Sequence, residues 1–200
     1  MPDSPTTAYD FGAGPVPAHR LENGAWIADS AVIDPTAIIG ADVRIDVGAR
    51  IGPGASVGDE AFIGEGADIW AHASIKGGAI IGEHATICRG AIIRDGASIG
   101  ECTSIDAGAI IGEGACIDAG AIIGRGASIG PSVTIRRSVY IGESAAIGER
   151  AFIGRGARIG TSASIGESVT IADFAVIAER QRMRIDDIGA SAPGAKGLRL

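Results

Sequence analysis

The chain has 200 residues, of which 46% are apolar and only 4% aromatic, and its formal net charge at pH 7 is −7. This acidic surplus disfavours nucleic acids and anionic membranes as partners, because both are negatively charged. No apolar run follows a basic one at the start, and no stretch approaches about 18 uncharged apolar residues. The sequence therefore predicts neither a signal peptide nor a membrane span, and we expect a cytoplasmic protein.

Residues 1–24 contain several prolines and glycines and no repeat. We interpret them as an irregular N-terminal lead-in. The terminal units of a repeat protein need covering, so this segment could fold across an open apolar end of the residues that follow.

Residues 25–177 repeat a six-residue unit without a phase slip. Isoleucine stands at every sixth position from Ile27 to Ile177, with Val57 as the one replacement, which gives 26 consecutive hexads. A small residue, mostly alanine, stands two places before each of them. This Ala-x-Ile spacing puts both apolar side chains on one face of a short strand. Each hexad is therefore predicted to be a very short strand followed by a corner, with Ile105 and its equivalents pointing inward.

The uninterrupted hexads resemble those of the bacterial hexapeptide-repeat proteins, the superfamily of hexapeptide acyltransferases. The resemblance implies an all-β fold, a left-handed parallel β-helix shaped as a triangular prism, with about 18 residues per coil and about 8 to 9 coils. Short irregular caps are expected at both ends. Members are typically homotrimers, so the expected partner is the chain itself. The lead-in around Gly14–Arg20 is also similar to that of an uncharacterised bacterial subgroup.

Glycine often follows the core isoleucine directly, as at Gly52, Gly82 and Gly100. We expect these glycines to supply permissive dihedral angles where the chain bends.

The hexads end after residue 177, and residues 178–188 space Met183 poorly for a strand. We therefore expect a short helical cap over residues 178–188 and a flexible tail over residues 189–200.

Residues 18 apart should stack in columns along the prism, so the surface can be laid out from the sequence. One outward column, from Ile38 to Ser164, has no charged residue and includes Ile92 and Ile110. A long uncharged column on an exposed face is typical of a contact surface. Small serine and alanine side chains on a flat face are the simpler alternative.

A first candidate site joins His84 and Cys102, which are 18 apart and fall in one corner column beside Glu83 and Glu101. A thiol next to an imidazole can act as a nucleophile or share a soft metal, although both uses need further groups. The alternative is that these are polar residues filling corner positions.

A second candidate site gathers Trp70, Cys88 and Asp106 in one corner column, with His72 in a neighbouring column. This mixture of groups could line a groove between subunits. Chance clustering on a surface of low complexity is the alternative.

These patterns leave three functions open, and we favour a rigid scaffold or binding protein with no cofactor. The resemblance implies an alternative, an acyltransferase that uses acetyl-coenzyme A and a histidine as general base, with His72 or His84 as the candidates. Such enzymes generally carry an inserted loop, and none interrupts these hexads. A metal-dependent hydratase of the same fold needs three converging histidines, which the spacing of His19, His72 and His84 does not match. We therefore expect no metal site. The small-molecule ligand is left open.

Overall fold

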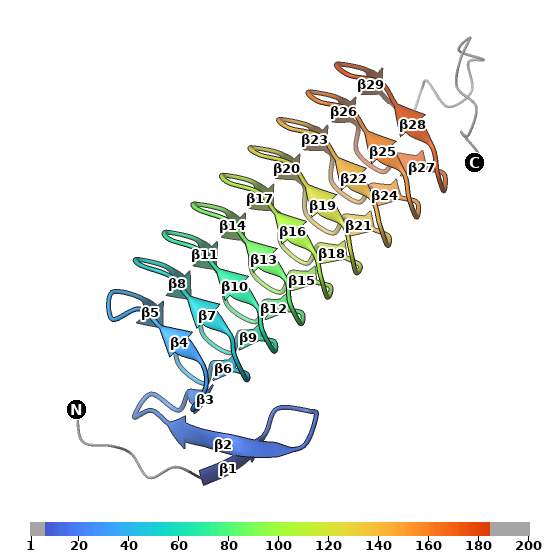
Figure 1. Cartoon of the computed structure of the whole chain (residues 1–200). Coiled ribbons are helices and arrows are strands. Elements are labelled where there is room, and N and C mark those ends of the chain that lie inside the picture. The colour runs from blue at the N-terminus through green and yellow to red at the C-terminus, as the bar shows by residue number, and fades with distance from the viewer. Residues whose placement is uncertain (1–6, 185–200) are drawn as a thin grey trace.

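The computed structural model describes residues 7–184, and nearly all of them form one continuous β-helix (Figure 1). Its strands are stacked into three parallel sheets, each strand pairing with the one 18 residues further along the chain. The coils wind in the left-handed sense. None of the described residues lies in a helix that could cross a membrane.

Sheet A forms the first face of each coil. Its strands in the prism are β3 (Trp26–Ala28), β6 (Arg44–Ile45), β9 (Phe62–Ile63), β12 (Ile80–Ile81), β15 (Ser98–Ile99), β18 (Cys116–Ile117), β21 (Thr134–Ile135), β24 (Phe152–Ile153) and β27 (Thr170–Ile171).

Sheet B forms the second face. Its strands are β4 (Val32–Ile33), β7 (Arg50–Ile51), β10 (Asp68–Ile69), β13 (Thr86–Ile87), β16 (Ser104–Ile105), β19 (Ile122–Ile123), β22 (Tyr140–Ile141), β25 (Arg158–Ile159) and β28 (Val176–Ile177).

Sheet C forms the third face. Its strands are β5 (Ile38–Ile39), β8 (Ser56–Val57), β11 (Ser74–Ile75), β14 (Ile92–Ile93), β17 (Ile110–Ile111), β20 (Ser128–Ile129), β23 (Ala146–Ile147), β26 (Ser164–Ile165) and β29 (Arg182–Met183).

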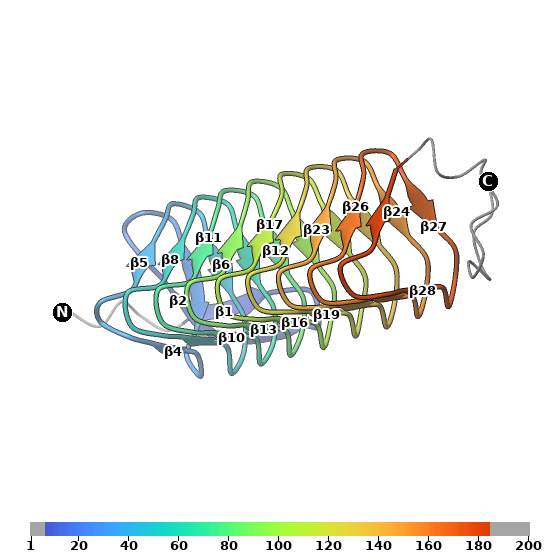
Figure 2. The same cartoon turned by 90° about the horizontal axis from the view of Figure 1, so that it is seen from above.

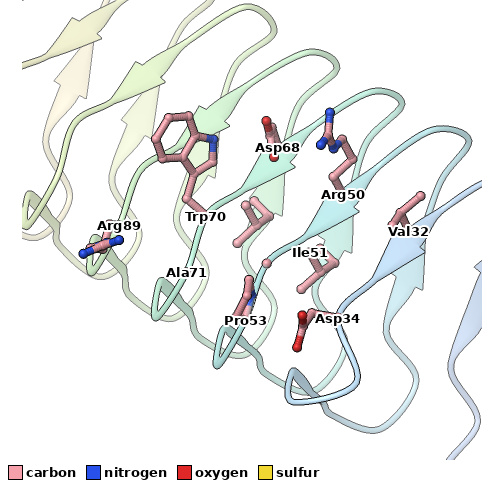
Figure 3. Close-up of a pocket in the computed structure, with 11 residues that line it drawn as sticks. Val32, Asp34, Arg50, Ile51, Pro53, Asp68, Trp70, Ala71 and Arg89 are labelled. Atoms are coloured by element: carbon pink, nitrogen blue, oxygen red, sulfur yellow. The ribbon is translucent and has the colours of Figure 1, made fainter.

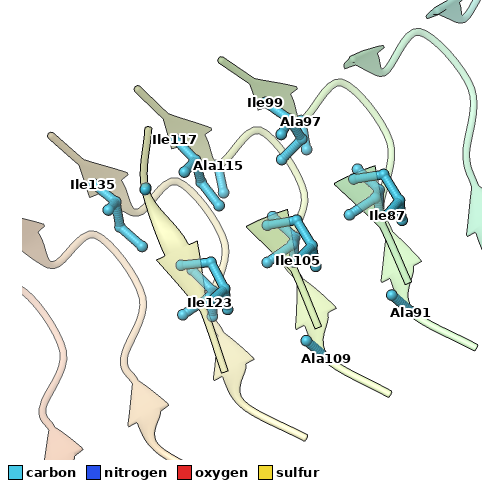
Figure 4. Close-up of a cluster of buried hydrophobic side chains, with 14 of the residues drawn as sticks. Ile87, Ala91, Ala97, Ile99, Ile105, Ala109, Ala115, Ile117, Ile123 and Ile135 are labelled. Atoms are coloured by element: carbon cyan, nitrogen blue, oxygen red, sulfur yellow. The ribbon is translucent and has the colours of Figure 1, made fainter. Parts of the chain in front are cut away.

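The interior is filled by the isoleucine and alanine of each hexad, which confirms the predicted register (Figure 4). Ile105 is fully buried, while Ser104, its neighbour in the same strand, faces outward. Ile33 and Ile39 are only partly buried, because they belong to the first coil and have no coil beneath them. Together with Leu21 they line a hollow of about 480 Å³ at this end of the prism.

The corners have a common backbone conformation. From Asp42 onward, the residue three places after each core position takes a left-handed φ, whether it is glycine, as at Gly78 (62°), or not, as at His84 (53°). Its amide donates to a carbonyl in the preceding coil in most corners, for example His84 N to Glu65 O at 2.8 Å, and to the Ser30 and Thr36 hydroxyls at Gly48 and Gly54. Backbone hydrogen bonds therefore stack the corners as regularly as they stack the strands.

The glycines directly after the core isoleucines have a different role from the one expected. Gly52, Gly82 and Gly100 are not among the residues with positive φ. A Cβ atom on Gly82 would instead lie 2.7 Å from the backbone nitrogen of Glu101 in the next coil. These glycines allow the coils to approach closely, so the expectation that they supply unusual dihedral angles was wrong.

The N-terminal lead-in is not irregular throughout. Strands β1 (Thr7–Asp10) and β2 (Pro15–Arg20) form an antiparallel hairpin, and β2 continues sheet A by pairing with β3. The hairpin packs on the outer side of sheet A, where the Tyr9 ring stacks on Trp26 with centroids 4.4 Å apart and Phe11 is buried. The hairpin extends sheet A beyond the first coil. It leaves the N-terminal end of the prism only partly covered.

The expected helical cap is also corrected where the structure describes it. Residues 182–183 form β29, which pairs with β26 in sheet C and buries Met183 as the isoleucines are buried. The prism therefore contains one more strand than the hexads predicted. Residues 185–188 of the expected cap and the expected flexible tail, residues 189–200, lie outside the described residues.

Candidate functional site

The three corners of the prism carry nearly all the candidate residues. We name them by the sheets they connect: the A–B corner follows strands such as β12 and β15, the B–C corner follows strands such as β10 and β13, and the C–A corner closes each coil. Figure 2 shows the prism from above, with the corners stacked in rows along its length.

The A–B corner places His84 and Cys102 in successive coils, both at left-handed φ values of 53°. The His84 ring extends over Gly66 in the preceding coil, where its Nδ1 fills the space that a glycine Cβ would need. Cys102 lies in the following coil. No side-chain hydrogen bond joins the two among the described residues, so the structure does not bring them together as a nucleophile and its base.

The B–C corner holds a shallow groove of about 430 Å³, in which Trp70 is the most prominent side chain (Figure 3). Trp70 is 49% exposed. Asp68 and Arg50 stand side by side on sheet B, next to Trp70, and are partners in the strand register. Arg89 lies on the other side of Trp70. The groove thus offers one aromatic surface flanked by charges of both signs.

His72 and Asp106 do not line this groove. The His72 ring covers Gly54 in the preceding coil, in the same way that His84 covers Gly66. Asp106 lies two coils beyond Trp70 and accepts a hydrogen bond from Ser104 Oγ at 3.3 Å. Burial raises the pKa of the neighbouring Cys88 thiol, and the negative charges of Asp106 and Asp68 raise it further. These effects lower the fraction of Cys88 that is thiolate, which is the reactive form.

A second groove, of about 680 Å³, follows the A–B corner and contains Glu83 and Glu101. At its centre, Arg136 Nε lies 3.5 Å from Asp118 Oδ2, and Cys116 Sγ lies 4.0 Å from Asp118 Oδ1. Burial raises the pKa of Cys116, Asp118 raises it further, and Arg136 partly offsets these effects. This groove is more polar than the first and changes from acidic to basic along its length.

Sequence reasoning overlooked three arginines of the grooves, Arg89, Arg136 and Arg137, and it placed Arg50 in the column of Asp68 without giving it a role in a site. The 18-residue stacking could have aligned Arg137 with Glu101 and Glu83. In residues 7–184 there is no group of three or more histidine, cysteine, aspartate or glutamate residues that could hold a metal ion, and the three cysteines are free thiols.

Solved structures share this architecture. The UDP-N-acetylglucosamine acyltransferase of Francisella novicida matches with a TM-score of 0.74 and 21% identity over 76% of this chain. The UDP-N-acetylglucosamine O-acyltransferase of Moraxella catarrhalis matches with a TM-score of 0.55 and 18% identity over 77% of this chain. The fold is that of the hexapeptide-repeat proteins. At these identities the likeness concerns the fold alone.

Both enzymes are longer than the part that this chain matches. The chain spans 62% of the Francisella enzyme and 71% of the Moraxella enzyme. Neither the comparison with family models nor that with curated proteins found a match. The grooves therefore have to be interpreted from their own residues.

Proposed function

We propose that this chain is a rigid β-helix scaffold or binding protein that self-associates through sheet C, as a homotrimer. The observation that carries this proposal is the outer face of sheet C. From Ile38 to Ser164 its outward column contains only isoleucine, serine and alanine. Arg182, added by β29 at the end of the prism, is its one charged member in the described residues.

Sheet B differs from sheet C in its charge, and sheet A differs in where the one charged residue of its outward column lies. Sheet A carries Arg44, and sheet B carries Arg50, Asp68 and Arg158 in its outward column. On sheet C, Ile92 and Ile110 are neighbours in adjacent strands and form an apolar step at mid-length. A flat face of small and apolar side chains can pack closely against another copy without burying an unpaired charge.

The regularity of the prism supports a structural role over a catalytic one. From β4 to β29 every strand has two residues, and no loop longer than a corner interrupts residues 32–184. Catalysis needs groups held in mutual reach, such as a base against a nucleophile. The His84 and His72 rings instead lie over glycines of the preceding coils.

The test of self-association is the double substitution Ile92→Arg with Ile110→Arg. It would bring unpaired charges into the contact. In high salt, which screens contacts between exposed charges, we expect the mass in light scattering to fall from three times that of the 20.0 kDa chain to that of a single chain. Ser104→Arg with Ile122→Arg, on sheet B, is the matched control and should leave the mass unchanged. An unaltered mass in the sheet C variant would exclude sheet C as the contact.

The second candidate function is acyl transfer from acetyl-coenzyme A, because the Francisella and Moraxella structures that share this fold are acyltransferases. Wild type, His72→Ala and His84→Ala should be assayed with acetyl-coenzyme A and a panel of amines and hydroxylated acceptors. The scaffold proposal expects no turnover. If the wild type turns over and one variant is slower by about 10²- to 10⁴-fold, that histidine is a general base and the scaffold proposal fails.

A further inference from the structure

The A–B corner has one column of side chains whose charge changes sign halfway along the prism. In chain order the column contains Glu65, Glu83, Glu101, Ala119, Arg137, Arg155 and Asp173. The corner hydrogen bonds keep it straight: Gly120 N donates to Glu101 O at 2.9 Å, and Ser138 N donates to Ala119 O at 3.1 Å. Successive side chains therefore emerge at intervals of about 4.8 Å, the spacing between neighbouring strands.

The central members of this column are exposed and available for a partner. Glu83, Glu101 and Arg137 form no ion pair within residues 7–184. All three line the groove of about 680 Å³, together with Ala119, which stands midway between the acidic and the basic side chains. The small side chain of Ala119 leaves room for a second surface to approach at this point.

We propose that this corner is the docking surface for a second copy of the chain, which lies antiparallel to the first with the two-fold axis at Ala119. In this arrangement Glu101 faces Arg137 of the second copy, and Glu83 faces Arg155 of the second copy. The two-fold symmetry repeats each contact, so that four interchain ion pairs form.

The ionic contact is confined to the central coils. One coil further out, Glu65 would face Asp173 of the second copy. Asp173 already accepts a hydrogen bond from Arg155 N at 2.8 Å and lies 3.9 Å from the Arg155 guanidinium. Arg155 therefore stands between Asp173 of its own chain and Glu83 of the other.

The outward column of sheet A is also arranged about a midpoint, with large apolar side chains on both sides of it. Its midpoint at the level of Ala119 is Cys116, and Ile80 and Phe152 lie two coils to either side. Ile80 is 49% exposed and Phe152 is 38% exposed. The antiparallel arrangement brings Ile80 against Phe152 of the second copy, which adds an apolar contact at both ends of the ion pairs.

A parallel arrangement through this corner is unfavourable. It would set Glu83 and Glu101 against the same glutamates of the second copy, and like charges facing each other across an interface oppose association. Exposed ion pairs are individually weak and are screened by salt, so the antiparallel contact should be salt-sensitive. The A–B corner lies opposite sheet C, so this contact requires neither sheet C nor the scaffold function.

The decisive experiment is a charge exchange measured by sedimentation velocity over a protein concentration series, at low and at high salt. Glu83→Arg with Glu101→Arg, and separately Arg137→Glu with Arg155→Glu, should each raise the dissociation constant of the pair by about tenfold or more. Because positions 83, 101, 137 and 155 are then all basic in one variant and all acidic in the other, mixing the two should restore the paired mass. This rescue shows that both variants are folded.

The orientation is tested by cross-linking in a background with Cys88, Cys102 and Cys116 changed to serine. A bifunctional thiol reagent should join Ser98→Cys in one protein to Thr134→Cys in another, because the antiparallel arrangement places them at the same level. Ser98→Cys should be joined to itself less readily, since its two copies would be offset by a further distance of about 9.6 Å, or two strand spacings, along the prism. A cross-link of Ser98→Cys with itself in preference to Thr134→Cys would show a parallel pair and overturn the proposal.

Both experiments are repeated with Ile92→Arg and Ile110→Arg present, so that loss of a sheet C contact is distinguished from loss of the corner contact. A mass that does not respond to either charge reversal would overturn the proposal. So would inorganic phosphate binding that depends on Arg137 while the mass stays constant, because the corner would then be an anion site.

Discussion

The interior of the prism has nearly the same residues in every coil, whereas its corners vary from coil to coil. Inside, each coil contributes the same isoleucine and alanine side chains, almost all fully buried. At the corners, the left-handed position holds glycine in some coils and serine, histidine, cysteine, arginine or phenylalanine in others. A non-glycine residue in this conformation is strained, so packing and backbone hydrogen bonds elsewhere in the coil must hold it there. The comparison teaches that the interior determines the backbone and leaves the corners free to vary, which is why the candidate sites lie at corners.

The largest effect should come from the interior. Ile105→Ala removes a fully buried side chain at mid-length and should cost about 2 to 5 kcal/mol in the free energy of unfolding, through lost burial and the cavity left behind. Ser104→Ala, one residue away on the outer side of the same strand, should change it by less than about 0.5 kcal/mol. Denaturant unfolding of the two variants measures the difference. Equal costs would mean that the interior does not govern stability in the way described.

A smaller effect separates two kinds of glycine at the corners. Gly82→Ala introduces a Cβ atom 2.7 Å from a backbone nitrogen of the next coil, and should cost about 1 to 3 kcal/mol through overpacking. Gly78→Ala meets no atom within 4 Å but must adopt a φ of 62°, and should cost about 1 kcal/mol. Thermal unfolding of both variants provides the comparison. If Gly82→Ala proved neutral or stabilising, close approach of the coils would not be the reason for glycine there.

The sequence was sufficient for the prism because its signal is periodic. The position of Ile105 in the core follows from an unbroken repeat, and the handedness followed from resemblance to known hexapeptide-repeat proteins. The two ends were predicted less well because each departs from the repeat. Pro15 and Pro17 are unusual in a strand, yet they lie in β2 at alternate positions. Met183 lacks the preceding alanine of a hexad, yet its flexible side chain fills the position of an isoleucine.

The sequence predicted the column in which each candidate residue lies, but not which atoms its side chain contacts. Stacking at 18-residue intervals correctly placed Trp70, Glu83 and Glu101 on exposed corners. It could not tell which way a side chain turns. His84 turns toward Gly66 because that glycine leaves open space, and this depends on a residue in another coil. The roles proposed for His72, His84, Cys102 and Asp106 stay predictions.

The smallest predicted effect concerns a corner thiol and leaves the fold unchanged. Burial and the charges of Asp106 and Asp68 hold the pKa of Cys88 above its ordinary value, so at mildly alkaline pH less of it is thiolate than in a free thiol. Asp106→Asn removes one of those charges and should lower this pKa, which raises the rate of Cys88 alkylation at a fixed pH. The pH midpoint of the reaction should shift to lower pH. Mass spectrometry of Cys88 after timed exposure to iodoacetamide measures both the rate and the pH midpoint.

Asp118→Asn, at the carboxylate beside Cys116, is the matched control. It should accelerate the alkylation of Cys116 and leave that of Cys88 unchanged. An unchanged Cys88 rate in Asp106→Asn would mean that the stacked carboxylate does not influence the thiol, and that neighbouring coils at this corner are electrostatically independent.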